Sequence, residues 1–525
     1  MQKGSLALLL HAHLPWVRHP SHEEFLEEDW LHEAVVECYL PLLRVFRNLV
    51  AGRMPVRITL TMTPPLCAML RDPLLQSRTR RYLDRGLAFI EAERLRTGNH
   101  GAMREILDHY DSRLREARAL YLSIGGDVVG AFAQLQADGL LQIITCAATH
   151  GFLPLMESVP GAMRAQILLG CDFHRECFGS APEGIWLPEC GYVPGVDRYL
   201  QEADIRWFVA DAHGLLYGEP RPRFGTHAAY FTPAGPAVFG RDRESSRKVW
   251  SAREGYPGDP AYRDFHKDAG FDLPEDYLRK YFPGIPPRRH TGFKYHRVTG
   301  RPEKEFYHRA WAMAAADHHA GDYFDGRVAQ FRNLAAILPV EPIVLSPFDA
   351  ELFGHWWYEG PEFLDLFLRK AAHDQNLFRL ETPGDYLRRN PTQQLVSPSP
   401  SSWGNKGYWE VWLDPCNSWI YPHLHAAARQ MTAAARARRD DPRPLTGRFL
   451  RQMARELLLA QSSDWAFLMK TGTAREYATC RTKDHILRFN ALSAELDLED
   501  PDVDFLAECE AHDNIFPNLD WTRYL

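Results

Sequence analysis

The sequence predicts an α/β fold in which parallel strands and helices form a barrel. Short apolar, β-rich segments alternate with segments of helical periodicity such as residues 32–52, a pattern typical of a parallel sheet covered by helices. Each of six apolar segments ends in polar residues. Active sites form at that end of the strands in a βα barrel, and an open doubly wound sheet also binds ligands there. Six strand ends that converge on one cluster favour the barrel.

The six predicted strands are each followed by residues that we expect at a functional site. In chain order they are SLALLLHAHLPW with His11 and His13, VRITLTMTPP with Thr61 and Thr63, QIITCAATHGFLP with Thr149 and His150, GIWLPECGY with Glu189, IRWFVADAHG with Asp211 and His213, and EPIVLSPFDAELFGHWWYEG with Asp349 and Glu351. Side chains two residues apart on a strand share one face, so His11 and His13 point to the same side. The site is therefore expected to combine residues that are far apart in the chain.

The chain has 525 residues and is long enough to form several structural units. Residues 1–75 and 141–395 are predicted to form the barrel, and the charged residues 76–140 a helical insertion. Residues 218–262, rich in Gly, Pro, Arg and aromatic residues, indicate an active-site loop region, because loops of that length are usually functional. A Ser/Pro-rich stretch, LVSPSPSSWGN, introduces a predicted helical C-terminal domain over residues 396–525.

The composition excludes several classes of partner. Hydrophobic residues make up 45% and charged residues 25% of the chain, as in ordinary globular proteins. The net charge is −7 and no long Lys/Arg run occurs, which gives no support for nucleic-acid binding. No apolar run approaches the roughly 20 residues of a membrane helix, so no membrane partner is expected. Nine scattered cysteines without a C-x-x-C pair indicate reduced thiols and a cytoplasmic location. The oligomeric state stays open, with a monomer as the simplest expectation.

Two carboxylates are candidates for catalysis. Glu189 and Asp349 each follow a buried strand and a nearby proline, and aromatic residues flank both: Trp186 and Tyr192 for the first, Phe348, Trp356, Trp357 and Tyr358 for the second. Cleavage of a glycosidic bond needs two acids in such a cleft, and apolar surroundings raise the pKa of the proton donor. The alternative is two ordinary acids that cap helices or pair with arginines. The pattern alone leaves both open.

The histidines have three interpretations. His11, His13, His150 and His213 could build a zinc site, as in a metal-dependent carbohydrate deacetylase on a related barrel. They could instead form hydrogen bonds with sugar hydroxyl groups, or be buried residues whose partners are backbone groups. Trp403 and Trp412 could likewise be stacking walls of a cleft or part of the core. The residues alone do not decide between these interpretations.

Five motifs in order, HAHLPW, ATHGFLP, GIWLPECGY, SPFDAELFGHWWYEGP and SSDWAFL, resemble glycoside hydrolase family 57, and most closely its α-1,4-glucan branching-enzyme branch. The resemblance extends from residue 6 to about residue 515. It implies a distorted, incomplete (β/α)7 TIM-like barrel with a helical insertion and a helical C-terminal domain. It implies no metal and no cofactor, which weighs against the zinc interpretation.

The resemblance also implies roles for individual residues. Glu189 matches the nucleophile and Asp349 the general acid/base. The substrate-binding residues that it implies, together with the candidates at the strand ends, are His11, His13, Trp30, His150, Trp186, Asp211, His213, Tyr230, Trp250, Trp356, Trp403, Trp412 and Asp464. Within this set His11, His13 and His150 match the subsite of the cleaved sugar, and Trp30, Trp250, Trp403 and Trp412 match an aromatic gate around the glucan.

The implied reaction is a double displacement on an α-1,4-glucan, with retention of configuration. Transfer to a 6-hydroxyl of another glucan would form a branch, as in glycogen biosynthesis, whereas transfer to water would make the protein an α-amylase. Branching members carry a long loop with a tyrosine that shields the intermediate. The segment from Asp211 to Trp250 is shorter here, with Tyr230 as the candidate tyrosine, and a short lid favours hydrolysis. A non-catalytic glucan-binding protein and a deacetylase are the remaining alternatives.

Overall fold

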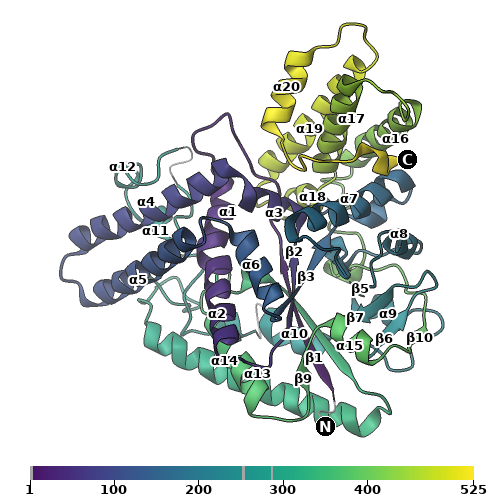
Figure 1. The fold of residues 1–525 in the computed structure, drawn as a ribbon. Helices are drawn as coiled ribbons and strands as arrows, with labels where there is room; N and C mark the ends of the chain where they lie inside the picture. The colour runs from purple at the N-terminus through teal and green to yellow at the C-terminus, as the bar shows by residue number, and fades with distance from the viewer. Residues whose placement is uncertain (1–3, 251–254, 285–287) are drawn as a thin grey trace.

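The computed structural model describes residues 4–250, 255–284 and 288–525. Its strands lie in the middle of the molecule and helices surround them (Figure 1). The last helices of the chain, drawn in green to yellow, gather at one end of the molecule, beyond the end of the sheet at which β2 and β3 adjoin α7 and α18. A central sheet thus carries helical layers on its faces and a separate group of helices at one end.

All six predicted segments form strands, and a seventh strand joins them. The seven strands are β1 Ser5–Ala12, β2 Ile58–Met62, β3 Leu141–Cys146, β4 Gly184–Trp186, β5 Trp207–Ala210, β7 Ala237–Gly240 and β8 Ile343–Asp349. Neighbours in the order β7-β5-β4-β3-β2-β1-β8 pair in parallel. Between β7 and β8 the sheet is joined at one parallel bridge, Arg241 to Leu345, where the Asp242 amide donates to the Leu345 carbonyl at 2.9 Å. The predicted α/β fold, a distorted (β/α)7 barrel, is confirmed.

Three short strands pair with strands of the barrel or with each other. β6 Ala229–Phe231 pairs antiparallel with β7, β10 Gln394–Leu395 pairs with β6, and β9 Arg379–Leu380 pairs with β1. Residues 218–262, expected as a loop region, therefore contain β6, β7 and a helix in their described part. The strands are only three and four residues long and flank a Thr-Pro-Ala-Gly-Pro turn. The proline and glycine residues of the segment therefore led to the prediction of a loop instead of strands.

Helices fill the connections between the strands. After β1 come α1 Glu28–Ala34 and α2 Leu40–Ala51, joined by the π-helical turn Val35–Tyr39, and between β2 and β3 lie α3 Pro64–Arg71, α4 Pro73–Thr97, α5 Gly101–Ser123 and α6 Val128–Ala137. Further along are α7 Pro160–Phe178, α8 Val196–Glu202, α9 Ala212–Leu216, α10 Arg243–Trp250, α11 Ala269–Asp272, α12 Glu275–Leu278, α13 Arg309–Ile337, α14 Gly360–His373 and α15 Pro383–Arg389. Four of these helices, α3, α4, α7 and α15, begin at a proline, which suits the first helical turn because its missing N–H has no partner there.

The C-terminal part consists of α16 Ile420–Ala437, α17 Pro444–Ala460, α18 Ser463–Thr471, α19 Arg475–Glu495 and α20 Val503–His512. α17 is buried along most of its length from Phe449 to Ala460, as expected for the central helix of a bundle. The Trp16 indole, just after β1, donates to Asp513 at 3.2 Å. This contact ties the end of the chain to its first strand, although 497 residues separate the two side chains.

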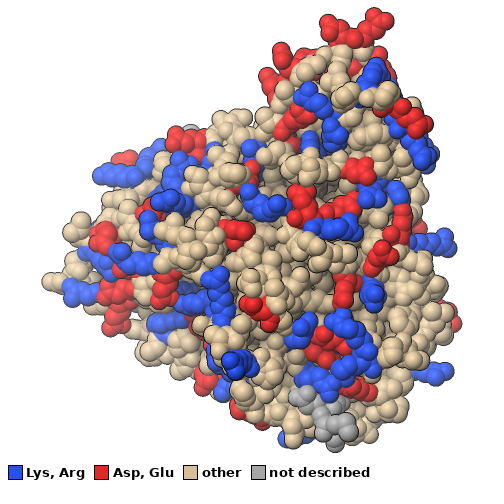
Figure 2. All heavy atoms as spheres, in the orientation of Figure 1, with Lys and Arg blue, Asp and Glu red and all other residues tan. Residues whose placement is uncertain are grey.

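The surface carries both signs of charge. On the face shown in Figure 2, Lys and Arg side chains alternate with Asp and Glu side chains, and no large area of one sign is present. Within the described ranges, no helix is both long and apolar enough to cross a membrane.

Candidate active site

Glu189 directly follows β4 in a strained turn. Its backbone lies in the left-handed region at φ 59° and ψ 24°, which costs free energy for a residue with a Cβ, and such strained residues are enriched at functional sites. Trp403 holds it in two ways. The indole Nε1 donates to the Glu189 carboxylate at 2.6 Å, and the Trp403 amide donates to the Glu189 carbonyl at 2.9 Å. The carboxylate is therefore fixed at the C-terminal edge of the sheet.

Asp349 ends β8 at the same edge. The β1–β8 ladder pairs Asp349 with His11, so both residues lie at the same level of the barrel. Glu351, two residues further on, turns inward as well: its carboxylate accepts from the His13 amide at 3.1 Å and from the Tyr39 hydroxyl. The ends of β1 and β8 thus bring two carboxylates and two histidines together.

Both candidate catalytic acids are shifted toward their protonated forms. Burial raises the pKa of Glu189 from 4.5 to about 7; the Trp403 hydrogen bond opposes this shift and the charge of Asp349 adds to it. Burial likewise raises the pKa of Asp349 from 3.8 to about 7, with Glu351 acting in the same direction and His13 and Arg241 opposing it. Acids whose pKa values lie near neutrality suit a site that exchanges protons with a substrate.

Three histidines line the site from two strands. The rings of His13 and His150 stack with centroids 3.8 Å apart, and His11 Nε2 lies 3.2 Å from His150 Nε2. Burial and the neighbouring histidines hold the pKa of His11 well below its usual range, and burial and His13 do the same for His150. These two rings are therefore neutral at physiological pH, and each can donate one hydrogen bond and accept another.

Asp464, at the start of α18, brings the C-terminal part into the site. Both of its oxygens lie 3.0 Å from His13 Nε2, and because a carboxylate only accepts, that nitrogen carries the proton. Although burial favours its neutral form, His13 and a hydrogen bond from Ser462 lower the pKa of Asp464 to about 2. His150 in turn is hydrogen-bonded to Ser463 at 2.8 Å. The N-terminus of α18 thus positions two histidines of the barrel.

One group in the site has metal-ligand geometry. The ligand atoms of His13, His150 and Asp464 lie within 4.8 Å of one another. His13 Nε2 already has its proton directed at Asp464 and His150 Nδ1 contacts Ser463. These partners give each group a role in hydrogen bonding without an ion, as expected for residues that contact a sugar.

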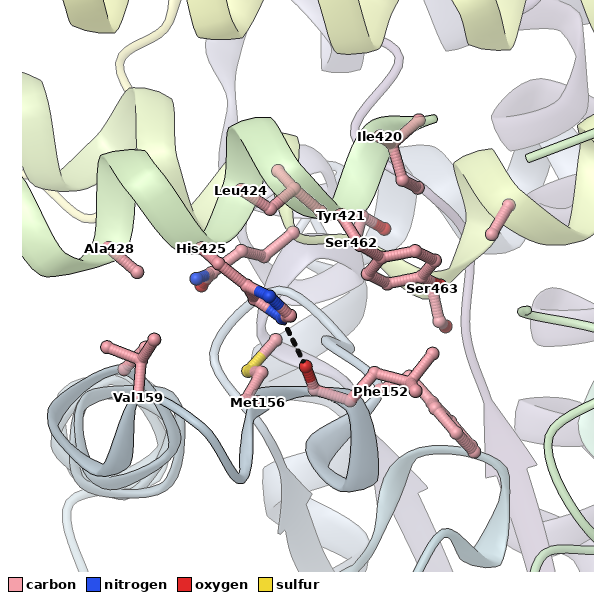
Figure 3. A pocket seen from close by; sticks show the side chains of 14 residues that line it. Phe152, Met156, Val159, Ile420, Tyr421, Leu424, His425, Ala428, Ser462 and Ser463 are labelled. Carbon is pink, nitrogen blue, oxygen red and sulfur yellow. Dashed lines mark hydrogen bonds between the residues drawn. The ribbon is translucent and has the colours of Figure 1, made fainter. Parts of the chain in front are cut away.

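A small cavity lies behind α18. It encloses about 20 Å³ between Phe152, Met156 and Val159 of the barrel and Ile420, Leu424 and Ala428 of α16, with Ser462 and Ser463 at one side. Figure 3 shows His425 crossing it to the Leu155 carbonyl, to which His425 Nε2 donates at 2.7 Å. A space of this size fits about one water molecule. It belongs to the packing between the barrel and α16 and has no room for a sugar.

A larger groove, of about 550 Å³, has the side chain of Trp403 in its wall. Of the predicted substrate-binding residues, Asp211, His213, Trp250 and Trp403 line it. Trp186 lies beneath, fully buried, with its ring 4.8 Å from that of Trp403 and 5.0 Å from that of His11. The side chain of Trp403 therefore both lines this groove and contacts the carboxylate of Glu189.

Four predicted residues lie elsewhere. Tyr230 is fully buried in β6, where its hydroxyl accepts from the Phe224 amide at 3.0 Å, so in this position it cannot cover a glycosyl intermediate. Trp412 is 1% exposed and stacks on Phe152 at 4.2 Å, which makes it core. Trp30 packs edge-on against Tyr477, and the exposed Trp356 stacks on Phe265 at 4.3 Å. None of the four lines the groove.

Arg241 is absent from the sequence-based prediction, and Glu351 was predicted only as a residue at the end of a strand, without a role. Arg241 follows β7, a strand that was not anticipated, and its guanidinium lies 5.3 Å from the Trp403 ring centroid and 3.5 Å from Asp211. Glu351 was visible at the end of the β8 motif, but its position beside Asp349 was not. The signal for Glu351 was its two-residue spacing from Asp349, whereas Arg241 offered no signal in the sequence.

Comparison with known proteins places the whole chain among carbohydrate-active enzymes. The family model for glycosyl hydrolase family 57 matches residues 7–398, and that for the C-terminal region of 1,4-alpha-glucan branching enzyme matches residues 423–524. A 1,4-alpha-glucan branching enzyme from Thermococcus kodakarensis is 33% identical over 98% of this chain and 77% of its own.

Two solved structures are similar over the full chain. The alpha-amylase AmyC from Thermotoga maritima is 38% identical, with a TM-score of 0.93 over 100% of this chain and 99% of its own. A branching enzyme from Pyrococcus horikoshii is 33% identical, with a TM-score of 0.90 over 100% and 97% of the two chains. One of these neighbours is named an alpha-amylase and the other a branching enzyme.

Proposed function

Because the chain belongs to glycoside hydrolase family 57, we propose that it is a retaining 1,4-α-glucan branching enzyme. The observation that carries the proposal is the pair Glu189 and Asp349, which lie at the ends of β4 and β8 on the same edge of the barrel and each have a pKa raised to about 7. The substrate is a linear α-1,4-glucan, and the product carries α-1,6 branches. We further infer that the reaction belongs to cytoplasmic synthesis of a glycogen-like polymer, which the nine unpaired cysteines support.

In the first step, Glu189 attacks C1 of a glucose unit, and Asp349 donates its proton to the departing glycosidic oxygen. The Trp403 N–H favours the ionised form of Glu189 at this stage. A covalent glycosyl-enzyme results, and the leaving chain departs with a free 4-hydroxyl. Asp349, now ionised, is ready to act as a base, and the nearby positive charge of Arg241 favours that form.

In the second step, Asp349 removes a proton from a 6-hydroxyl of another glucan, and that oxygen attacks C1 and releases Glu189. Two inversions at C1 give net retention. The neutral His11 and His150 and the Asp464-linked His13 are suited to bind hydroxyl groups of the sugar at the cleaved position. Their mutual contacts hold the rings in place before the substrate binds.

Transfer is favoured over hydrolysis by the C-terminal match to branching enzymes and by the 33% identity to named branching enzymes. A second candidate, α-1,4-glucan hydrolysis, is favoured by the neighbour named as an alpha-amylase at 38% identity. The buried position of Tyr230 adds weight to this candidate, because it leaves the predicted shield of the intermediate without its tyrosine. The two activities differ only in whether an alcohol or water accepts the glycosyl group.

The deciding experiment incubates the purified protein with amylose. New α-1,6 linkages, counted after treatment with a debranching enzyme, are compared with new reducing ends. We expect α-1,6 linkages to exceed reducing ends at least several-fold. Mainly reducing ends would assign the chain as an amylase. A protein that binds amylose but produces neither would be a non-catalytic binding protein, and Glu189→Gln serves as the inactive control.

A further inference from the structure

Two cysteines from neighbouring helices are in contact away from the candidate active site. Cys67 lies on α3 and Cys177 in the last turn of α7, and these two helices lie side by side (Figure 1). Both side chains pack in the same apolar cluster, where Cys67 is buried and Cys177 is partly accessible at its edge. The two thiols are hydrogen-bonded to each other. The pair thus combines one sulfur that a small solute can reach with one that is enclosed.

Arg71 places a positive charge beside the more accessible thiol. Its guanidinium Nη1 lies 3.3 Å from Cys177 Sγ. Arg71 and Cys67 are four residues apart on α3, so they share one face of this helix, and the contact with Cys177 shows that this face is directed at α7. The same Nη1 also lies 3.4 Å from the carboxylate of Glu176. The guanidinium is therefore shared between a carboxylate and a sulfur.

The surroundings favour a thiolate at Cys177 and a thiol at Cys67. The hydrogen bond from Cys67 is the main cause that lowers the pKa of Cys177 below its usual value, and the charge of Arg71 acts in the same direction. Burial, the charge of Glu176 and the C-terminal turn of α7 oppose this shift. Burial raises the pKa of Cys67 well above its usual range, so this thiol keeps its proton and can donate it in the hydrogen bond. Because the thiolate is the reactive form, Cys177 is the nucleophile of the pair.

We propose that hydrogen peroxide oxidises this pair to a disulfide, with Cys177, beside Arg71, as the thiol that reacts first and Cys67 as the thiol that resolves the product. The thiolate of Cys177 attacks one oxygen of the peroxide: an S–O bond forms, the O–O bond breaks, and hydroxide leaves and takes a proton from the solvent. The sulfur of Cys67 then gives up its proton and attacks the sulfenic acid on Cys177. The S–S bond forms, the S–O bond breaks, and the departing hydroxide takes that proton. The two thiols lose two electrons, and the peroxide becomes two molecules of water.

This disulfide is a reversible modification and not a structural bond. Both thiols are free in the structure, and disulfides in a reducing compartment are mostly transient and redox-sensing. The bond would join α3 to α7 and so link two helices that follow neighbouring strands of the barrel. The inference goes beyond the proposed function and stands whether or not the chain acts on glucans.

The test treats the purified, reduced protein with hydrogen peroxide and identifies the oxidised cysteines by mass spectrometry after digestion. We expect a cross-linked peptide that joins Cys67 to Cys177 and disappears on treatment with dithiothreitol. Cys480, which is exposed on α19, serves as the comparison and should be oxidised at least about fivefold more slowly than Cys177. In the Cys67→Ser protein, Cys177 should stop at the sulfenic acid, which dimedone traps.

Two arginine variants test the activation of the thiol. Arg71→Gln should slow the oxidation of Cys177 about threefold, because it removes the adjacent positive charge. Arg175→Gln is the matched control: Arg175 lies on the same helix as Cys177 but pairs with Asp172 at 3.0 Å, so its loss should leave the rate unchanged. A parent protein without the cross-link, a Cys177 that reacts no faster than Cys480, or equal rates in the two arginine variants would each overturn the inference. Thermal unfolding of each variant establishes that it is folded.

Discussion

Replacement of Glu189 by Gln should remove activity and at the same time stabilise the folded protein at alkaline pH. Burial is the main reason why the pKa of Glu189 rises from 4.5 to about 7. A carboxyl group whose pKa rises on folding contributes full stability below its unfolded value, and that contribution is lost as the pH rises through the folded value. Glutamine stays neutral at every pH, and its amide oxygen can still accept the hydrogen bond from Trp403.

The size of the effect follows from the pKa values. An increase from 4.5 to about 7 corresponds to about 3 kcal/mol once the group is ionised, and partial contact with solvent at the strand end reduces this to about 2 kcal/mol. Unfolding entropy of about 2.1 cal/mol/K per residue gives about 1.1 kcal/mol/K for 525 residues. The variant should therefore melt about 2 °C higher than the parent at pH 8.

Differential scanning calorimetry between pH 5 and 8.5 measures this difference. Most of the 2 °C gap should disappear by about pH 5, since the parent carboxyl group is then largely protonated. Glu91→Gln, on the exposed surface of α4, controls for the loss of a carboxylate as such. A gap of the same size at all pH values, or a variant that melts lower at pH 8, would show that Glu189 is not destabilised by burial of its charge.

Three further substitutions test the surroundings of the acids. Trp403→Phe keeps an aromatic ring but removes the N–H that donates to Glu189. The value of kcat should fall about 10- to 100-fold, and the acid limb of the pH–rate profile should move to higher pH. An acid limb that stays in place would contradict this role of Trp403. Glu351→Gln removes a charge that raises the pKa of Asp349. The alkaline limb of the pH–rate profile should therefore move to lower pH, and kcat/KM at pH 8 should fall about threefold. An alkaline limb that stays in place would refute this effect. Asp464→Asn weakens the anchor of His13, and kcat/KM on amylose should fall at least about tenfold with little change in Tm; full activity would show that the anchor is dispensable.

The strand ends were predictable because two local signals coincide there. A run of buried apolar residues must end where the chain leaves the sheet, and a carboxylate directly after it, such as Glu189, is a candidate for a site at that edge. Parallel strands bring these ends to one edge, so the grouping of His11, His150 and Asp349 followed from topology alone. The family resemblance then added Asp464, which lies on a helix and carries no such signal.

What could not be predicted depends on contacts between distant segments. Tyr230 and Trp412 carry side chains suited to a sugar site, yet each is enclosed by its own part of the core. Burial is a property of the packed fold, and the sequence of a loop-like segment does not show whether an aromatic side chain in it faces solvent or the core. Arg241 was missed for the converse reason, because the strand that positions it is only four residues long.

The different surroundings of the two acids support the roles proposed for them, without reference to any motif. Glu189 accepts a hydrogen bond from an indole N–H at 2.6 Å, and a donor of this kind stabilises the anion that a nucleophile must be. For Asp349, burial and the charge of Glu351 stabilise the protonated form that a general acid must have. Once Asp349 has given up its proton, Arg241 and His13 stabilise the resulting carboxylate, which then serves as the base. Asp349 is therefore suited to act in both steps, because charges of both signs influence it. Exchange of the two roles would place a hydrogen-bond donor on the acid and leave the nucleophile beside a repelling carboxylate.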